Sequence, residues 1–194
     1  MARAPTTTER PSGLEYRPDF LTEAEERQAL GVIEPLDFYE VAMRGQVARR
    51  TVRHFGLRYG YEDHELTPTD PFPAALAWLQ ERCAELARVE PEQLVEVLVT
   101  RYPPGAPIGW HRDAPMFGKV VGVSLAASAR MRFQRRVGDE RRVFELDLAP
   151  RSAYLLAGSV RWAWQHSIPP TKALRYSVTF RTLHPRRTTG FAGA

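Results

Sequence analysis

His111 and Asp113 are the two residues whose chemical types and spacing most directly indicate chemistry. In an extended chain, side chains two positions apart point to the same side, so this imidazole and this carboxylate would face one space. Two histidines and one carboxylate on one face, with coordination positions left open, are the donor set of non-heme Fe(II) oxygenases. We therefore predict that the segment 101–113 supplies two of the three ligands of a metal centre.

His166, in the strand-like run 161–168, is the candidate for the third ligand. It lies too far beyond Asp113 for a local motif, but a later strand of the same fold could bring it back to the site. An isolated histidine is more often a hydrogen-bonded core or surface residue than a ligand. The assignment therefore depends on whether another part of the chain supplies a reason for a metal.

The C-terminal segment Leu174–Thr182 supplies that reason. Its apolar positions Tyr176, Val178 and Phe180 alternate with the polar positions Arg175, Ser177, Thr179 and Arg181. We expect an interior strand whose apolar face packs against helices and whose polar face lines a cavity. Two buried guanidinium groups without partners would be strongly destabilising. Asp113 can neutralise one of them, and a dicarboxylate such as 2-oxoglutarate would satisfy both.

Thr100 and Tyr102 are two positions apart on the strand predicted at Leu94–Tyr102, which leads into the metal segment. Both side chains could therefore face the same cavity. The tyrosine hydroxyl would suit a carboxylate oxygen, because a phenol can donate a hydrogen bond. Both residues are candidates for binding the cosubstrate.

Short strands preceded by helices must position these residues. Thr22 and Glu25 form a capping box that begins a helix ending near Glu34. Asp70 and Pro71 predict the start of a second helix, with an apolar stripe over residues 74–89. Further strands are expected at 38–41, 50–61, 119–126, 130–135, 142–146, 152–157, 162–168 and 174–182. This order predicts an α+β, mainly β fold: a double-stranded β-helix (jelly roll) with N-terminal buttressing helices.

The composition indicates one domain. The chain has 194 residues, of which 43% are hydrophobic, and a formal net charge of +4. We expect a single domain over residues 14–183, between flexible tails at 1–13 and 184–194. The lone Cys83 excludes a disulfide framework and a cysteine zinc site. No apolar run reaches the roughly 20 residues of a membrane span, and no signal region follows Met1, so we expect a cytoplasmic monomer that does not bind membranes.

Four sequence features, in this order, resemble the AlkB-like Fe(II)/2-oxoglutarate dioxygenases. They are Tyr102-x-Pro-Gly, His111-x-Asp113, His166 and the strand Arg175-Tyr-Ser-Val-Thr-Phe-Arg181, and the resemblance extends from about Phe20 to Leu183. It implies that His111, Asp113 and His166 hold Fe(II), with no catalytic residue beyond these ligands. It also implies a 2-oxoglutarate site made of Thr100, Tyr102, Arg175, Ser177, Thr179 and Arg181. Ser177 stands where the family usually has asparagine.

The resemblance further implies an oxidative demethylase of N-methylated bases in DNA or RNA, which converts 2-oxoglutarate and O2 to succinate and CO2. The segment 38–61 would be the family's substrate-recognition lid, with Arg50, Arg53, Tyr59 and Tyr61 as candidates for substrate binding and Trp164 as a wall of the site. However, residues 114–116 lack the acidic side chains with which the DNA-repair members read the base. An alternative is therefore an AlkB-like hydroxylase or demethylase of protein side chains or of a small metabolite. A third alternative is a non-catalytic, basic β-domain that binds nucleic acid without metal.

Overall fold

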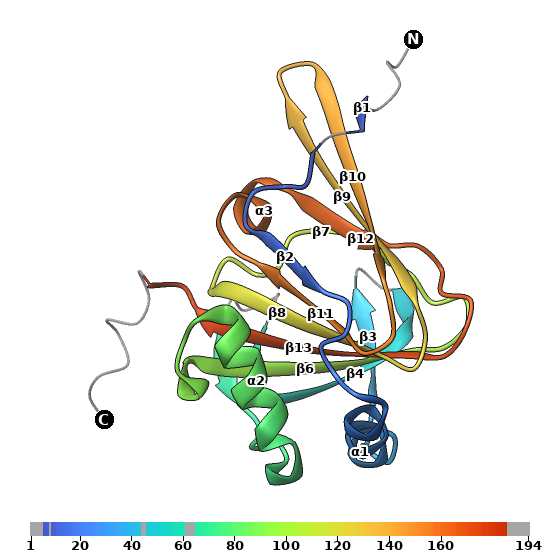
Figure 1. Cartoon of the computed structure of the whole chain (residues 1–194), viewed down its shortest axis with the longest axis vertical. Coiled ribbons are helices and arrows are strands. Elements are labelled where there is room, and N and C mark those ends of the chain that lie inside the picture. Colours follow the sequence, from blue (N-terminus) through green and yellow to red (C-terminus); the bar gives the residue numbers. More distant parts are fainter. Residues whose placement is uncertain (1–5, 8, 44–45, 61–64, 186–194) are drawn as a thin grey trace.

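Two β-sheets form most of the protein (Figure 1); the computed structural model describes residues 6–7, 9–43, 46–60 and 65–185. The larger sheet has the strand order β2 (Leu14–Arg17), β11 (Ser152–Leu156), β8 (Phe117–Leu125), β13 (Arg175–Leu183), β6 (Leu94–Tyr102), β4 (Gln46–Tyr59) and β3 (Tyr39–Met43), and β5 (Leu66–Pro68) pairs with β4. The smaller sheet has the order β1 (Thr6–Thr7), β10 (Glu140–Leu148), β9 (Ala129–Val137), β12 (Gln165–Ile168) and β7 (Ile108–His111). A cluster of buried side chains joins the sheets, with Val120 and Leu156 from the larger and Met131 and Phe133 from the smaller. The predicted jelly roll is confirmed.

Two helices, α1 (Glu23–Ile33) and α2 (Ala77–Ala87), cover the other face of the larger sheet (Figure 1). Ile33 of α1 and Leu79 of α2 belong to the same buried cluster as Val178 and Phe180 of β13. The remaining helical pieces are the single-turn elements η1 (Ala74–Leu76) and η2 (Pro91–Gln93) and the short helix α3 (Gly158–Ala163). The helices therefore buttress the sheet from the side opposite the smaller sheet, as the sequence predicted.

Strand β13 lies in the interior of the larger sheet, between β8 and β6, and is antiparallel to both. Tyr176, Val178 and Phe180 all join the buried cluster beneath the helices. Since side chains alternate along a strand, Arg175 and Arg181 face the smaller sheet instead. The alternating pattern therefore gave both the position of the strand and the orientation of its two faces.

The helix starts were predicted with mixed success. The capping box at α1 is present: the Thr22 hydroxyl accepts a hydrogen bond from the Glu25 backbone N–H at 3.2 Å, and the Glu25 carboxylate accepts one from the Thr22 N–H at 2.7 Å. The start predicted at Asp70 is wrong, because the chain reaches α2 only through η1, after Pro73. The Asp70 side chain instead pairs with Arg53, so a tertiary contact replaces the cap.

The strand predicted at 162–168 is wrong in its first half. Residues Gly158–Ala163 form α3, and only Gln165–Ile168 form β12. The alternating tryptophans suggested a continuous strand, but Arg161 is buried and donates hydrogen bonds to backbone carbonyls of Ala114, in the loop after Asp113, and of Phe117 and Gly118, at the start of β8. These contacts stabilise a helical turn against the local pattern.

The two predicted tails lie partly outside the described residues. Within the N-terminal one, Thr6 and Thr7 form the short strand β1, which pairs in parallel with Arg142 and Val143 of β10. Of the C-terminal one, only His184 and Pro185 are described. No helix in the described ranges is long and apolar enough to span a membrane.

Candidate active site

His111, Asp113 and His166 meet between the two sheets. His111 ends β7 and is the direct cross-strand partner of His166 on β12. Their ring centroids are 4.3 Å apart, and Oδ2 of Asp113, in the loop after β7, lies 3.6 Å from Nε2 of His166. The fold thus gathers the three side chains that the sequence singled out from two separate segments.

The charges around this triad keep its groups in the forms that bind metal. Burial acts to raise the pKa of the Asp113 carboxyl, but the positive charge of Arg181, with smaller contributions from His166 and His111, outweighs it and holds the pKa well below the ordinary value. Burial and the nearby His111 lower the pKa of His166 to about 3. An ionised carboxylate and a neutral imidazole are the protonation states that a divalent ion requires.

The donor set fits a metal, although the described residues contain no three His, Cys, Asp or Glu side chains already arranged to enclose one. Arg181 donates two hydrogen bonds to Oδ1 of Asp113, at 3.0 and 2.7 Å, so Oδ2 is the oxygen left to bind. Nδ1 of His111 lies 2.9 Å from the Gly109 carbonyl oxygen. Such a contact typically orients a ligating imidazole and leaves Nε2 to the metal.

Arg175 is the strongest indication of an anionic ligand. Its side chain is completely buried, at 0% exposure, and only Nε has a partner, the Ser124 hydroxyl at 2.9 Å. Nη1 and Nη2 have no hydrogen-bond partner among the described residues. The guanidinium lies 5.1 Å from the ring centroid of Tyr102, its cross-strand neighbour. A buried cation with two unused donor groups is costly unless a carboxylate or similar anion binds it.

Arg181 differs from the expectation that a ligand would neutralise both arginines. Besides Asp113, it donates a hydrogen bond from Nη1 to Oε2 of Glu96 at 2.6 Å. Glu96 is itself buried and lies 3.2 Å from Nδ1 of His54 on β4. Sequence reasoning missed Glu96, although it shares its strand face with Thr100 and Tyr102 by the period of two. Arg181 is therefore a support for Asp113, and Arg175 remains for the ligand.

The other predicted cosubstrate residues lie on the same face of the larger sheet as Arg175. Thr100, Tyr102, Ser177 and Thr179 are all buried. Ser177 is paired in register with both Thr100 of β6 and Ser124 of β8. The result is a group of hydroxyls on the face of the larger sheet that carries both arginines.

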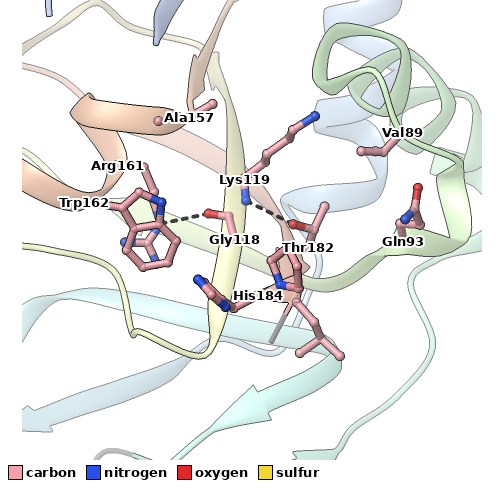
Figure 2. Close-up of a pocket in the computed structure, with 12 residues that line it drawn as sticks. Val89, Gln93, Gly118, Lys119, Ala157, Arg161, Trp162, Thr182 and His184 are labelled. Carbon is pink, nitrogen blue, oxygen red and sulfur yellow. Dashed lines mark hydrogen bonds between the residues drawn. The ribbon is translucent and has the colours of Figure 1, made fainter. Parts of the chain in front are cut away.

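Arg161 is a second residue that sequence reasoning missed. From α3, which directly precedes the segment carrying His166, its guanidinium donates hydrogen bonds to the carbonyl oxygens of Gly118 at 2.9 Å and of Ala114 and Phe117 at 2.7 Å each. It also stacks on Trp162, at the edge of a cavity of about 430 Å³ that Gly118, Lys119 and His184 help to line (Figure 2). One side chain therefore ties the loop after Asp113 to the segment that carries His166.

We expect Arg161→Met to lower the free energy of unfolding by roughly 3 kcal/mol, because it leaves buried carbonyl oxygens without a donor. Mn(II) affinity should fall by about 10-fold or more, since supporting contacts of this kind orient metal ligands. Urea denaturation and a Mn(II) titration measure the two effects. Arg82→Met is the matched control, because its ion pair with Glu25 is at the surface and contributes up to about 1 kcal/mol. Unchanged Mn(II) affinity in Arg161→Met would show that the hydrogen bonds of Arg161 do not help to orient the metal ligands.

The predicted substrate residues are not brought together. Arg53 pairs with Asp70 and lies over the Phe55 ring, on the helix-covered face of the sheet. Tyr59 is buried against Phe117. Trp164 is buried in the cluster between the sheets, with the Arg135 guanidinium 4.9 Å from its ring centroid. Arg50 is half-buried directly before the part of β4 that pairs with β6. Tyr61 lies outside the described residues, as do positions 44–45 of the predicted lid.

Comparison with known proteins agrees with this fold. Residues 13–181 match the family model of the 2OG-Fe(II) oxygenase superfamily. The chain is 28% identical over 171 residues to the tRNA (carboxymethyluridine(34)-5-O)-methyltransferase alkbh8 of Xenopus tropicalis, in a match covering 84% of this chain and 26% of that protein. It is 27% identical over 184 residues to the alkylated DNA repair protein ALKBH8 homolog of Arabidopsis thaliana, covering 82% of this chain and 51% of that protein. The chain thus spans between about a quarter and a half of these curated relatives.

Among solved structures, that of OsALKBH1 is similar with a TM-score of 0.66 at 17% sequence identity. The match covers 91% of this chain and 100% of that one. At this identity the similarity shows a shared fold.

Proposed function

The chain belongs to the 2OG-Fe(II) oxygenase superfamily, whose members use Fe(II), 2-oxoglutarate and O2, and from this we propose that it is an oxidative demethylase of N-methylated bases in nucleic acid. The observation that carries the proposal is the buried Arg175, with two donor groups unused, on the same sheet face as the arginine that holds Asp113. An anion-binding position beside two histidines and a carboxylate is what this reaction needs.

Each residue has a distinct part. When bound, Fe(II) supplies the oxidation, in which 2-oxoglutarate and O2 give succinate and CO2 and a second oxygen atom is transferred to the substrate. His111, Asp113 and His166 would hold the metal. Arg175 would bind the carboxylate of 2-oxoglutarate that lies away from the metal, as a bidentate donor. Arg181 keeps Asp113 ionised and in place. The burial of Asp113 and His166 between the two sheets would keep stray water from the reacting groups.

Nucleic acid as the substrate is supported by two observations. The relatives in Xenopus and Arabidopsis are named for tRNA modification and for DNA repair. The chain also has a net charge of +4, and its exposed arginines can contact phosphates. A hydroxylated N-methyl group breaks down to formaldehyde and the demethylated base.

A second candidate, oxidation of a protein side chain or small metabolite, is favoured by the apolar surroundings of the metal loop. Ala114 and Met116 are buried with Tyr59 and Phe117 in one cluster, where an acidic base reader would be needed. Apolar side chains at these two positions are compatible with an apolar substrate group. Family membership leaves the third alternative, a non-catalytic β-domain, without support.

The experiment supplies Fe(II), 2-oxoglutarate and O2 to the purified chain together with N-methylated single-stranded DNA or RNA oligonucleotides. Formaldehyde and succinate should form in equal amounts, and mass spectrometry should show loss of the methyl group. Peptide and metabolite extracts serve as the parallel arm. Succinate formation stimulated by an extract, with unchanged oligonucleotides, would replace the first candidate by the second.

The outward face of the β9–β10 hairpin, which extends from the body of the molecule (Figure 1), is where we expect phosphate contacts. Arg136 and Arg141 are directly opposite each other in the antiparallel pair, where like charges repel. The Arg141 guanidinium also lies 5.9 Å from the Trp110 ring centroid, and that of Arg132 lies 5.1 Å from it. By contrast, Arg130 on the same face is neutralised by Glu145 and Asp147. A chain of phosphates beside a base-stacking tryptophan would relieve this repulsion.

Replacing both Arg136 and Arg141 by serine should weaken binding of single-stranded oligonucleotides and reduce the salt dependence of that binding. The slope of log K against log salt should fall by about 1.4, or about 0.7 for each lost phosphate contact. Fluorescence anisotropy at several salt concentrations measures it. Arg130→Ser, whose charge is already paired, should leave the slope unchanged. An equal change in both variants would show that the effect is one of net charge alone.

A further inference from the structure

Tyr154, in the middle of β11, is matched to a glycine on the neighbouring strand. It is buried and is the cross-strand partner of Gly122 of β8. A Cβ atom at Gly122 would lie 2.2 Å from Cζ of Tyr154 and 2.4 Å from its hydroxyl oxygen. No other residue type fits there without moving the ring. A glycine inside a strand weakens the strand and often marks such a close approach. The absence of a side chain at Gly122 therefore leaves room for the Tyr154 phenol.

The hydroxyl of Tyr154 therefore lies over the face of the sheet that carries the site. Gly122 is paired in register with Thr179 of β13, which stands between Arg175 and Arg181 on that strand. The charges of Arg175, Asp113 and Arg181 all act on the Tyr154 hydroxyl. The phenol is therefore close enough to interact electrostatically with Arg175, the anion-binding arginine, and with Arg181, which holds the metal-binding carboxylate.

The same hydroxyl is available as a donor. Burial raises the pKa of Tyr154 to about 12, so it keeps its proton at neutral pH. Within the described residues, the hydroxyl makes no hydrogen bond to a protein group. A buried tyrosine hydroxyl usually has a partner, and here the surrounding groups are arranged for an anion.

We propose that Tyr154, whose ring occupies the space that Gly122 leaves, binds the cosubstrate by donating a hydrogen bond from its hydroxyl to a 2-oxoglutarate that extends from Arg175 toward the metal side chains. This inference rests on the proposed oxygenase site and adds a residue to it. The ligand chemistry is that of a short dicarboxylate, because Arg175 offers two unused donors to a carboxylate at one end, Tyr154 offers one donor farther along, and a metal held by His111, Asp113 and His166 would take acceptor atoms at the other end.

The test is the affinity of the Mn(II)-loaded protein for 2-oxoglutarate, measured by titration calorimetry without turnover. Tyr154→Phe removes only the hydroxyl and keeps the ring, so the fold and the Mn(II) affinity should be retained. The Kd for 2-oxoglutarate should rise by about 10-fold, the loss expected for one hydrogen bond to a charged group. In turnover assays the KM for 2-oxoglutarate should rise while kcat changes little. Tyr39→Phe, at an exposed tyrosine, is the control.

A second variant, Gly122→Ala, forces the ring away from its position and should also raise the Kd for 2-oxoglutarate. In that background, Tyr154→Phe should raise the Kd little further. A Kd within twofold of the wild type in Tyr154→Phe overturns the inference and leaves the oxygenase function standing. Failure of the wild-type, Mn(II)-loaded protein to bind 2-oxoglutarate at all overturns the proposed function and the inference together.

Discussion

Replacing His111 by alanine is expected to lower the affinity for Mn(II) or Fe(II) at least about 100-fold, because even residues that only support a metal ligand contribute about 10- to 100-fold. Succinate formation from 2-oxoglutarate should disappear with the metal. The protein should still fold, since His111 is only half-buried at the end of β7 and its side chain makes one hydrogen bond among the described residues, with the Gly109 carbonyl of the same strand. Metal titration and thermal unfolding together measure the two effects.

His184→Ala is the matched control for this prediction. His184 is likewise half-buried, but it packs edge-on against Trp162, with ring centroids 4.9 Å apart, at the cavity shown in Figure 2. Its loss should leave metal affinity and succinate formation unchanged. Retained tight Mn(II) binding in His111→Ala would show that the metal centre has been placed on the wrong residues.

Arg175→Met is expected to remove 2-oxoglutarate binding without loss of stability. Truncating one member of a buried charged pair costs about 2–5 kcal/mol of binding free energy, or roughly 30- to 4,000-fold in Kd. The unliganded protein should be as stable as the wild type or more stable, because a methionine of similar length replaces a buried cation with two unused donor groups. Calorimetry with 2-oxoglutarate and urea denaturation of the metal-free protein give the two values.

Arg181→Met provides the contrast on the same strand. Arg181 has two buried carboxylate partners, Asp113 and Glu96, so its removal leaves both charges uncompensated. We expect a loss of roughly 3–5 kcal/mol in stability. Equal destabilisation of the two variants would show that Arg175 already has a partner within the unliganded protein. The assignment of the anion site to Arg175 would then be wrong.

The features that the sequence predicted well are those encoded by local periodicity. The alternation along β13 identified an interior strand, and the spacing of His111 and Asp113 placed both on one side of the chain. The capping box at Thr22 likewise depends on residues three positions apart. In each case the stabilising contact is local or repeats along one element, so it is visible in the order of the residues.

The features that the sequence did not predict depend on contacts between distant segments. Arg161 donates hydrogen bonds to carbonyls between Ala114 and Gly118, more than forty positions earlier, and a segment that looked like a strand is a helix there. Glu96 was on the correct face of β6, but its role becomes visible only when β13 brings Arg181 beside it. The ion pair of Arg53 with Asp70, seventeen positions later, was likewise not visible in the local pattern, and the role of Arg53 in substrate binding stays a prediction.

Strand β13 carries residues for both anion binding and support of the metal-binding carboxylate, so both depend on the register of this one strand. Its polar side chains reach the anion site at one end and the metal-binding carboxylate at the other, while its apolar side chains lie beneath the helices. A slip of one residue would exchange the two sets completely. Insertions and deletions in this strand should therefore abolish activity, whereas the end of the β9–β10 hairpin near Val137 and Glu140 lies beyond the residues of β9 that pair with β12 and can change in length more freely.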